Sequence, residues 1–324
     1  TEAKEMAWLS TVQPRVNLIL PTSLCSGQIA GLAARQLAKN DPAMDYATLI
    51  HTEGCGVAFA STREVYAETM VGYAAHPLVN RCLFLEHGCE KAHNDYLRSL
   101  LANAGLAAAD FGWASVQLDG GIRNALTKMR AYFADHEDDP PPVKPHTQGL
   151  TLALMADGAV PDAVALTLAQ LAQAVLAAGG SVVVPNQPPL LAQPTFQSTL
   201  ALPTERTPTL AHGEAVALPG FHVMETPTHH WIETITGLGA TGASVIIAHT
   251  TEPRAGHPFI PVLLLTDDVA QPGADLYLNG NPASWQIAIR ERVAETLAGR
   301  YQPVALVQNN VDFQLTRGWL GIST

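Results

Sequence analysis

The stretch NLILPTSLCSG, residues 17–27, contains an apolar run, a polar turn and the start of a helical pattern. Residues 17–20 form a short, nearly continuous apolar run, and a helical pattern extends from Gly27 to Leu37. A run of this kind, followed directly by a helix, is typical of a strand buried on both faces of a parallel sheet. The small polar residues at 21–26 are then expected where the strand ends.

The same order of strand, polar turn and helix recurs along the chain. Further strands are predicted at 47–50, 82–85 and 113–116, and helices at 61–75, 91–104 and 121–134. The segment DDPPPVKP, residues 138–145, cannot continue a helix or a central strand, so it predicts a linker. Beyond it the pattern restarts, with strands at 150–154, 181–184, 245–248, 261–265 and 276–278 and helices at 161–178 and 284–298.

The order of these elements predicts an α/β protein with a mostly parallel sheet and helices on both faces. Two sub-domains are expected. The N-terminal half, 1–139, carries Cys and His motifs, and the C-terminal half, 146–324, carries His-rich motifs. Residues 185–220 are rich in proline and poorly periodic, so a long excursion is predicted there.

The composition is that of a folded chain, with 47% hydrophobic and 15% charged residues. The net charge is −11 and no run of Lys and Arg occurs, so no nucleic-acid partner is expected. No apolar stretch reaches the roughly 18 residues that span a bilayer. The first five residues lack the pattern of a secretory signal, so a cytoplasmic protein without membrane association is expected.

Three predicted strand ends carry a cysteine beside glycine or another small residue, namely Cys25, Cys55 and Cys89. Because the carboxyl ends of parallel strands meet at one edge of a sheet, a shared site is expected there. A helix beginning just after a cysteine would lower the pKa of its thiol. A cysteine taken alone is more simply a small buried residue, which is our interpretation of Cys82 inside an apolar strand.

His51 and Glu90 complete a predicted metal-binding set with Cys25, Cys55 and Cys89. Thiolate, imidazole and carboxylate ligands together suit iron, zinc or a similar divalent ion. Four cysteines in a chain of 324 residues do not make a disulfide framework, which also favours thiols that are buried or chemically used.

Candidates for general acid–base catalysis are His249, His257 and Glu53. His249 directly ends the predicted strand 245–248, a position where catalytic groups collect. An imidazole with neighbouring carboxylates suits proton transfer.

The predicted substrate contacts are small polar residues, glycines, histidines and a cation near strand ends. Glycine lets the backbone approach a ligand closely, and a guanidinium pairs with a carboxylate. These contacts are Thr22, Ser23, Gly120, Gly121, Thr226, His229, His230 and Arg254. Each has a plainer alternative, because glycine pairs often form turns, histidine pairs occur in packed loops and arginines are common at surfaces.

Taken in order, the motifs resemble those of the altronate/galactarate dehydratase family. The matching residues are Cys25-Ser26, His51, Gly54-Cys55-Gly56, Gly72-Tyr73, His76-Pro77, Gly88-Cys89-Glu90, Asp119-Gly120-Gly121, Met224-Glu225-Thr226-Pro227, Gly237 and the stretch 256–262. The resemblance extends over about residues 15–285. It implies a Rossmann-like variant of the α/β fold and an enzyme that removes water from an aldonic or aldaric acid.

The resemblance also implies a divalent metal. Iron is expected, with manganese, zinc or an iron–sulfur cluster on Cys25, Cys55 and Cys89 as alternatives. A small hydroxy acid is the expected partner, and a homo-oligomer the expected assembly. Family members that cleave a carbon–sulfur bond share this region, so the leaving group stays open.

The chain departs from the family pattern at 156–162 and 185–188, where a cysteine and an acidic residue of the family are replaced. The small N-terminal β domain of many members is also missing from the sequence, so a separate β domain or subunit is a candidate partner. The expected function is a metal-dependent hydro-lyase. A non-catalytic or regulatory paralogue that binds a small acid, or one subunit of a split lyase, is the alternative.

Overall fold

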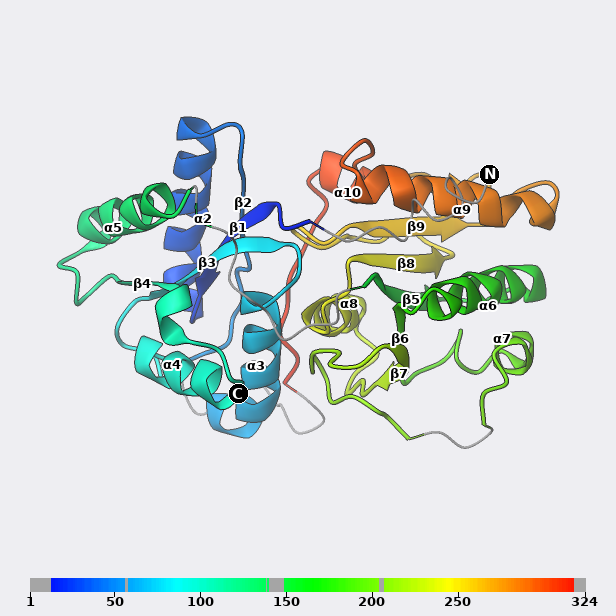
Figure 1. Cartoon of the computed structure of the whole chain (residues 1–324), viewed down its shortest axis with the longest axis horizontal. Coiled ribbons are helices and arrows are strands. Elements are labelled where there is room, and N and C mark those ends of the chain that lie inside the picture. Colours follow the sequence, from blue (N-terminus) through cyan, green and yellow to red (C-terminus); the bar gives the residue numbers. More distant parts are fainter. Residues whose placement is uncertain (1–12, 56–57, 138, 140–148, 204–206, 318–324) are drawn as a thin grey trace. The chain divides into compact units, whose positions relative to one another are not determined.

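A computed structural model describes residues 13–55, 58–137, 139, 149–203 and 207–317. The chain divides into two compact units (Figure 1). The N-terminal unit contains residues 13–145 together with the segment from Phe313 onwards, and the C-terminal unit contains residues 146–312. No sequence pattern predicted that the last described residues, 313–317, belong to the N-terminal unit.

The N-terminal unit is a four-stranded parallel sheet in the order β2-β1-β3-β4. Its elements are β1 (Val16–Pro21), α2 (Leu24–Asn40), β2 (Asp45–Thr48), α3 (Ala58–Ala74), β3 (Val79–Glu86), α4 (Asn94–Asn103), η2 (Ala108–Asp110), β4 (Gly112–Ser115) and α5 (Ile122–Asp135). Figure 1 shows α2 and α5 on one face of this sheet and α3 and α4 on the other. Every residue of β1 is buried, as its apolar run predicts.

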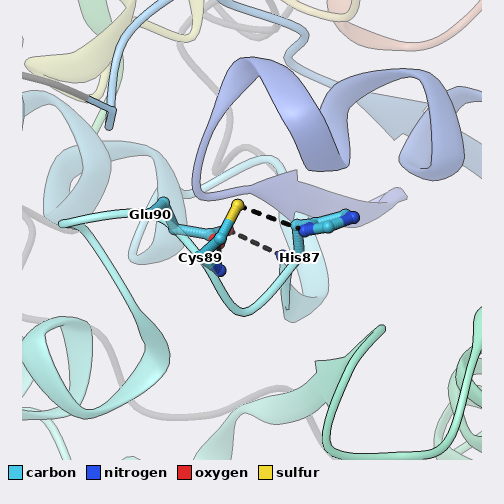
Figure 2. Close-up of side chains that lie close together, drawn as sticks. All are labelled: His87, Cys89 and Glu90. Atoms are coloured by element: carbon cyan, nitrogen blue, oxygen red, sulfur yellow. Dashed lines mark hydrogen bonds between the residues drawn. The ribbon is translucent and has the colours of Figure 1, made fainter.

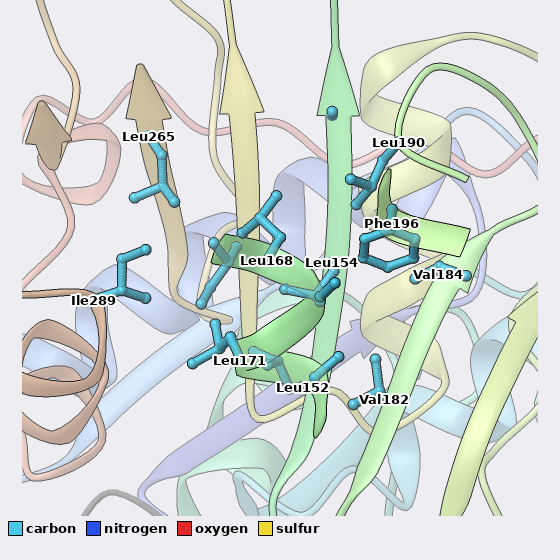
Figure 3. Close-up of a cluster of buried hydrophobic side chains, with 14 of the residues drawn as sticks. Leu152, Leu154, Leu168, Leu171, Val182, Val184, Leu190, Phe196, Leu265 and Ile289 are labelled. Carbon is cyan, nitrogen blue, oxygen red and sulfur yellow. The ribbon is translucent and has the colours of Figure 1, made fainter. Parts of the chain in front are cut away.

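The C-terminal unit is a six-stranded parallel sheet in the order β10-β9-β8-β5-β6-β7. Its elements are β5 (Thr151–Asp157), α6 (Asp162–Ala177), β6 (Ser181–Pro185), α7 (Pro194–Thr199), β7 (Gly220–Met224), α8 (Trp231–Ala240), β8 (Val245–Thr250), β9 (Val262–Thr266), β10 (Leu276–Tyr277), α9 (Pro282–Leu297) and α10 (Val304–Val307). Figure 3 shows its core, in which leucines of β5 and α6 pack with Ile289 of α9.

The α/β fold class predicted from the sequence is confirmed, with parallel sheets flanked by helices. Five elements were not predicted, namely η2, α7, β7, α8 and α10. β7 was missed because Gly220 and His222 interrupt its apolar run at the edge of the sheet. Within the described part of the chain, no helix combines the length and the apolar composition needed to cross a bilayer.

Candidate functional site

The carboxyl ends of β1 and β3 lie at the point where the strand order of the N-terminal sheet reverses. The chain leaves β1 for β2 on one side and continues in β3 on the other side of β1. Ligands of open α/β sheets bind at such a reversal. Thr22 and Ser23 follow β1, and the loop 87–93 joins β3 to α4.

The Glu90 carboxylate connects these two strand ends. Its Oε1 accepts hydrogen bonds from the hydroxyls of Thr22 (2.7 Å) and Ser23 (3.0 Å). The backbone amides of His87, Gly88 and Cys89 donate to the same carboxylate at 2.7, 2.7 and 2.8 Å. Burial opposes ionisation of Glu90, but these hydrogen bonds outweigh it and hold the pKa of the carboxyl below its ordinary value.

Because a carboxylate offers about four lone-pair sites, these donors use the acceptor capacity of Glu90. Glu90 was predicted to bind a metal. In the structure the Glu90 carboxylate orders the loop that carries Cys89. The hydroxyls of Thr22 and Ser23 donate hydrogen bonds to the same carboxylate.

His87 and Cys89 present a nitrogen and a sulfur to the same space (Figure 2). The Cys89 Sγ lies 3.3 Å from the His87 Nδ1. Together with Glu90 they form the one group of His, Cys, Asp or Glu side chains, among the residues that the structure describes, with ligand atoms within 4.8 Å of one another. His87 was not in the predicted ligand set, although its position two residues before Cys89 was a signal for it.

Cys25, in the first turn of α2, lies near this group but outside it. It lies close enough to Cys55 and Cys89 to affect the pKa of both thiols. Desolvation, with Cys25 and Glu90 nearby, raises the pKa of both Cys55 and Cys89. The expected lowering of these two values by helix N-termini is therefore wrong, because desolvation and neighbouring negative groups outweigh the helix dipole.

We refer to Cys25, Cys55, His87 and Cys89 as the thiol cluster. Its donors are three sulfurs and one imidazole nitrogen, a set that fits zinc or iron better than magnesium or calcium. A metal must displace protons from the thiols, and the raised pKa values of Cys55 and Cys89 make that displacement costlier near neutral pH. The donor types nevertheless fit a soft or borderline divalent metal, because most of them are sulfur.

Both ring nitrogens of His51 are used by the backbone. Nε2 lies 2.9 Å from the carbonyl oxygen of Pro21, and Nδ1 accepts from the amide of Glu53 at 3.2 Å. Burial lowers the pKa of His51 to about 4, so the ring is neutral and positions the chain after β2. The Glu53 carboxylate is 3% exposed and lies 2.6 Å from the Nε of Arg317. The structure thus gives both His51 and Glu53 protein partners.

A cavity of about 340 Å³ opens beside the loop 87–93, between the carboxyl ends of β3 and β4. Gly88 and Glu90, the two neighbours of Cys89, are part of its wall. The predicted contacts Gly120 and Gly121 form the turn into α5 with φ of 81° and 113°, which only glycine adopts readily. Their amides bond within that turn, and Asp119 before them lines the cavity.

The predicted histidines of the C-terminal unit are also held by protein groups. His249 is fully buried, and its Nε2 lies 2.9 Å from the carboxylate of Asp267. His257 accepts the amides of Phe259 and Ile260 on Nδ1, and burial lowers its pKa to about 3. His257 is thus a neutral structural residue here, while His249 stays a predicted base that Asp267 orients.

The other predicted contacts in that unit have local roles. The Nδ1 of His229 lies 2.8 Å from the Gln187 side chain, and His230 caps α8. The Thr226 hydroxyl donates to the carbonyl of Met224 at 3.2 Å. Arg254 forms an ion pair with Asp157 at the end of β5. These four assignments stay predictions.

Residues 16–135 match the family described as D-galactarate dehydratase/Altronate hydrolase, second domain. The match begins at the first residue of β1 and ends at the last residue of α5, so it covers the whole four-stranded sheet. The thiol cluster and the 340 Å³ cavity both fall inside it. A search of curated proteins found no match to the chain.

Proposed function

We propose that this chain, whose residues 16–135 match the second domain of the D-galactarate dehydratase/altronate hydrolase family, is a metal-dependent hydro-lyase acting on a sugar acid. The observation that carries the proposal is the close group of His87, Cys89 and Glu90, with Cys25 and Cys55 nearby, at the β1/β3 switch point inside the matched segment. The match to this family supports sugar-acid dehydratase chemistry. The metal and the substrate are the finer parts of the proposal.

The residues of the chain would have the following roles. Cys89, His87 and Cys25 would hold the metal, with Cys55 as a further sulfur donor. When bound, a divalent metal polarises a coordinated carboxylate and hydroxyl and so makes the neighbouring C–H bond more acidic. Glu90 fixes the loop that presents Cys89, and the adjoining cavity receives the rest of the acid.

Iron is the proposed metal, with manganese, zinc or an iron–sulfur cluster as alternatives. A homo-oligomer and a separate small β domain are the proposed partners, and His249 with Asp267 is the proposed proton acceptor of the C-terminal unit.

The test is metal and sulfide content of the full chain purified without oxygen, for wild type, Cys89→Ala and Cys82→Ala. Cys82 is the matched control because it is buried in β3 and lies outside the thiol cluster. We expect at least one metal per wild-type chain, retained in Cys82→Ala and lost in Cys89→Ala. Acid-labile sulfide would identify a cluster, and its absence a mononuclear site.

Turnover is then measured as formation of a 2-oxo acid from galactarate and from altronate. Metal content that is equal in all three proteins would show that the thiol cluster is not the metal site. A metal-loaded wild type without turnover on either acid would contradict the lyase activity.

A second candidate, a protein that binds a small acid without turnover, is favoured by the partners of His51 and Glu90. Two of the five predicted ligands are used by backbone groups and hydroxyls, which reduces the donors to three thiols and His87. Binding of galactarate by a chain that takes up no metal after iron loading would support this candidate.

A further inference from the structure

Another cavity, of about 320 Å³, lies at the amino ends of the strands of the N-terminal sheet. The second residues of β1, β2 and β3, which are Asn17, Tyr46 and Asn80, all line it. The candidate metal site lies beyond the carboxyl ends of β1 and β3, so the two sites occupy opposite edges of the sheet. The volume is at the lower end of the range of about 300–1,000 Å³ that is usual for small-molecule sites, which suits a ligand the size of an amino acid.

Arg81 is a buried cation in the wall of this cavity, with 5% of its surface exposed. It lies in β3 two positions before Leu83, which packs in the core with residues of α2 and α5. Because alternate residues of a strand face the same way, the Arg81 side chain leaves the sheet on the side of these two helices. Its Nε donates to the carbonyl of His136 at 3.3 Å. Arg130 of α5 is exposed and adds a second guanidinium to the wall, and such groups bind carboxylates through charge-assisted hydrogen bonds.

Two carboxylates, those of Asp41 and Glu137, lie in the same wall. The Tyr46 hydroxyl and the Ala43 amide each donate to Asp41 at 3.3 Å, which orients its carboxylate. Burial raises the pKa of the Tyr46 hydroxyl, and the charges of Asp41 and Glu137 add to this shift, so both carboxylates lie near the phenol. The C-caps of α2 and α5, Asp41 and His136, also line the cavity, which brings the negative ends of two helix dipoles to its wall.

The wall of the cavity therefore carries both signs of charge. An anion alone would meet two carboxylates and the negative ends of two helices, and a cation alone would meet Arg81 and Arg130. A ligand that has both a carboxylate and an ammonium group has a partner for each charge. Leu37, Met44 and Phe133 add apolar surface to the wall, which favours a ligand with an apolar side chain.

We propose that this cavity binds a free α-amino acid with an apolar side chain. The guanidinium groups of Arg81 and Arg130 bind its carboxylate, and the carboxylates of Asp41 and Glu137 bind its ammonium group. The apolar part of the wall contacts its side chain. The inference is independent of the proposed function, because the residues that line this cavity are separate from the thiol cluster and from the cavity beside it.

The experiment is calorimetric titration of the full chain, as isolated, with L-leucine and two analogues. The first analogue, 4-methylpentanoate, lacks the ammonium group of leucine, and the second, 3-methylbutylamine, lacks its carboxylate. Wild type is expected to bind L-leucine about tenfold or more tightly than either analogue, the loss expected from one charge-assisted contact. Equal affinity for the three compounds, or binding of none, would overturn the inference.

Variants on the two sides of the cavity separate the two charged contacts. Arg130→Met should reduce the preference for L-leucine over 3-methylbutylamine about threefold or more and leave the preference over 4-methylpentanoate unchanged. Asp41→Asn keeps an acceptor for the Tyr46 hydroxyl and should have the opposite effect on the two preferences. Damage to the fold would weaken the binding of all three compounds and would not separate the preferences in this way.

Matched controls are available in the same unit. Arg123→Met removes an exposed cation of α5, and Asp110→Asn removes an exposed carboxylate of η2, both outside the wall of the cavity. Both controls should bind L-leucine with the affinity of wild type. Unchanged preferences in Arg130→Met and Asp41→Asn would refute the assignment. Binding of L-leucine by a chain that takes up no metal would support this inference while contradicting the proposed lyase, so the two proposals fail separately.

Discussion

The Nε of Arg317 lies 2.6 Å from Oε1 of Glu53, which joins the last described segment to the chain after β2 across 264 residues. The glutamate is 3% exposed, and Thr52 also donates to it at 3.1 Å. Removing one partner of a buried pair leaves an uncompensated charge, which is strongly destabilising. The pair is one of the contacts that join residues 313–317 to the N-terminal unit.

Arg317→Met is expected to lower the free energy of unfolding by about 2–4 kcal/mol, because Glu53 loses its counter-charge inside the protein. Urea unfolding near neutral pH measures the change. Arg300→Met, at an exposed position, is the control and should change the stability by less than about 0.5 kcal/mol. Adding Glu53→Gln to Arg317→Met should restore part of the loss, and a purely additive double mutant would contradict the pairing.

Glu90→Gln is expected to destabilise the protein by about 2–4 kcal/mol at pH 7, because an amide NH₂ would face the amides of Gly88 and Cys89. The native pKa of Glu90 lies below its ordinary value of about 4.3. Its ionised form therefore stabilises the fold fully above that pH, and the contribution is lost as the pH falls through the native pKa. Denaturation at several pH values should show the difference from wild type closing below about pH 4.

Glu64→Gln, an exposed glutamate on α3, controls for the loss of a surface charge. It should leave the stability near the wild-type value across the same range. A Glu90→Gln deficit that persists unchanged at acid pH would mean that the loop depends on side-chain shape and not on the charge.

The parallel sheets could be predicted because their strands are short apolar runs, as in residues 17–20 and 82–85, and burial of both faces follows from that pattern. The roles of the side chains in the loops after these strands could not be predicted in this way. The sequence placed His51 and Glu90 among metal ligands by their neighbours, whereas backbone hydrogen bonds decide their roles. Asn94 and Lys128 belong to no sequence motif. They line one cavity only because the fold brings α4 and α5 together.

The neutral state of His51 predicts an acid-sensitive stability. Burial lowers its pKa to about 4 from an ordinary value near 6.5. Between these values the unfolded chain binds a proton that the native state does not, so stability falls as the pH drops from about 6.5 to 4. The total is on the order of 3 kcal/mol from this residue. His51→Gln should reduce the slope of unfolding free energy against pH in that window by one proton, and an unchanged slope would contradict the burial argument.

His87→Ala is expected to weaken zinc or iron binding at least ~10-fold, because the Nδ1 that lies 3.3 Å from the Cys89 Sγ is removed. Competition with a coloured chelator measures the affinity without requiring turnover. His93→Asn is the matched control, since His93 caps α4 through the amide of Tyr96 and asparagine preserves a cap. Equal affinities in the two variants would remove His87 from the thiol cluster. A loss confined to His87→Ala would show that the loop after β3 supplies both a nitrogen and a sulfur ligand.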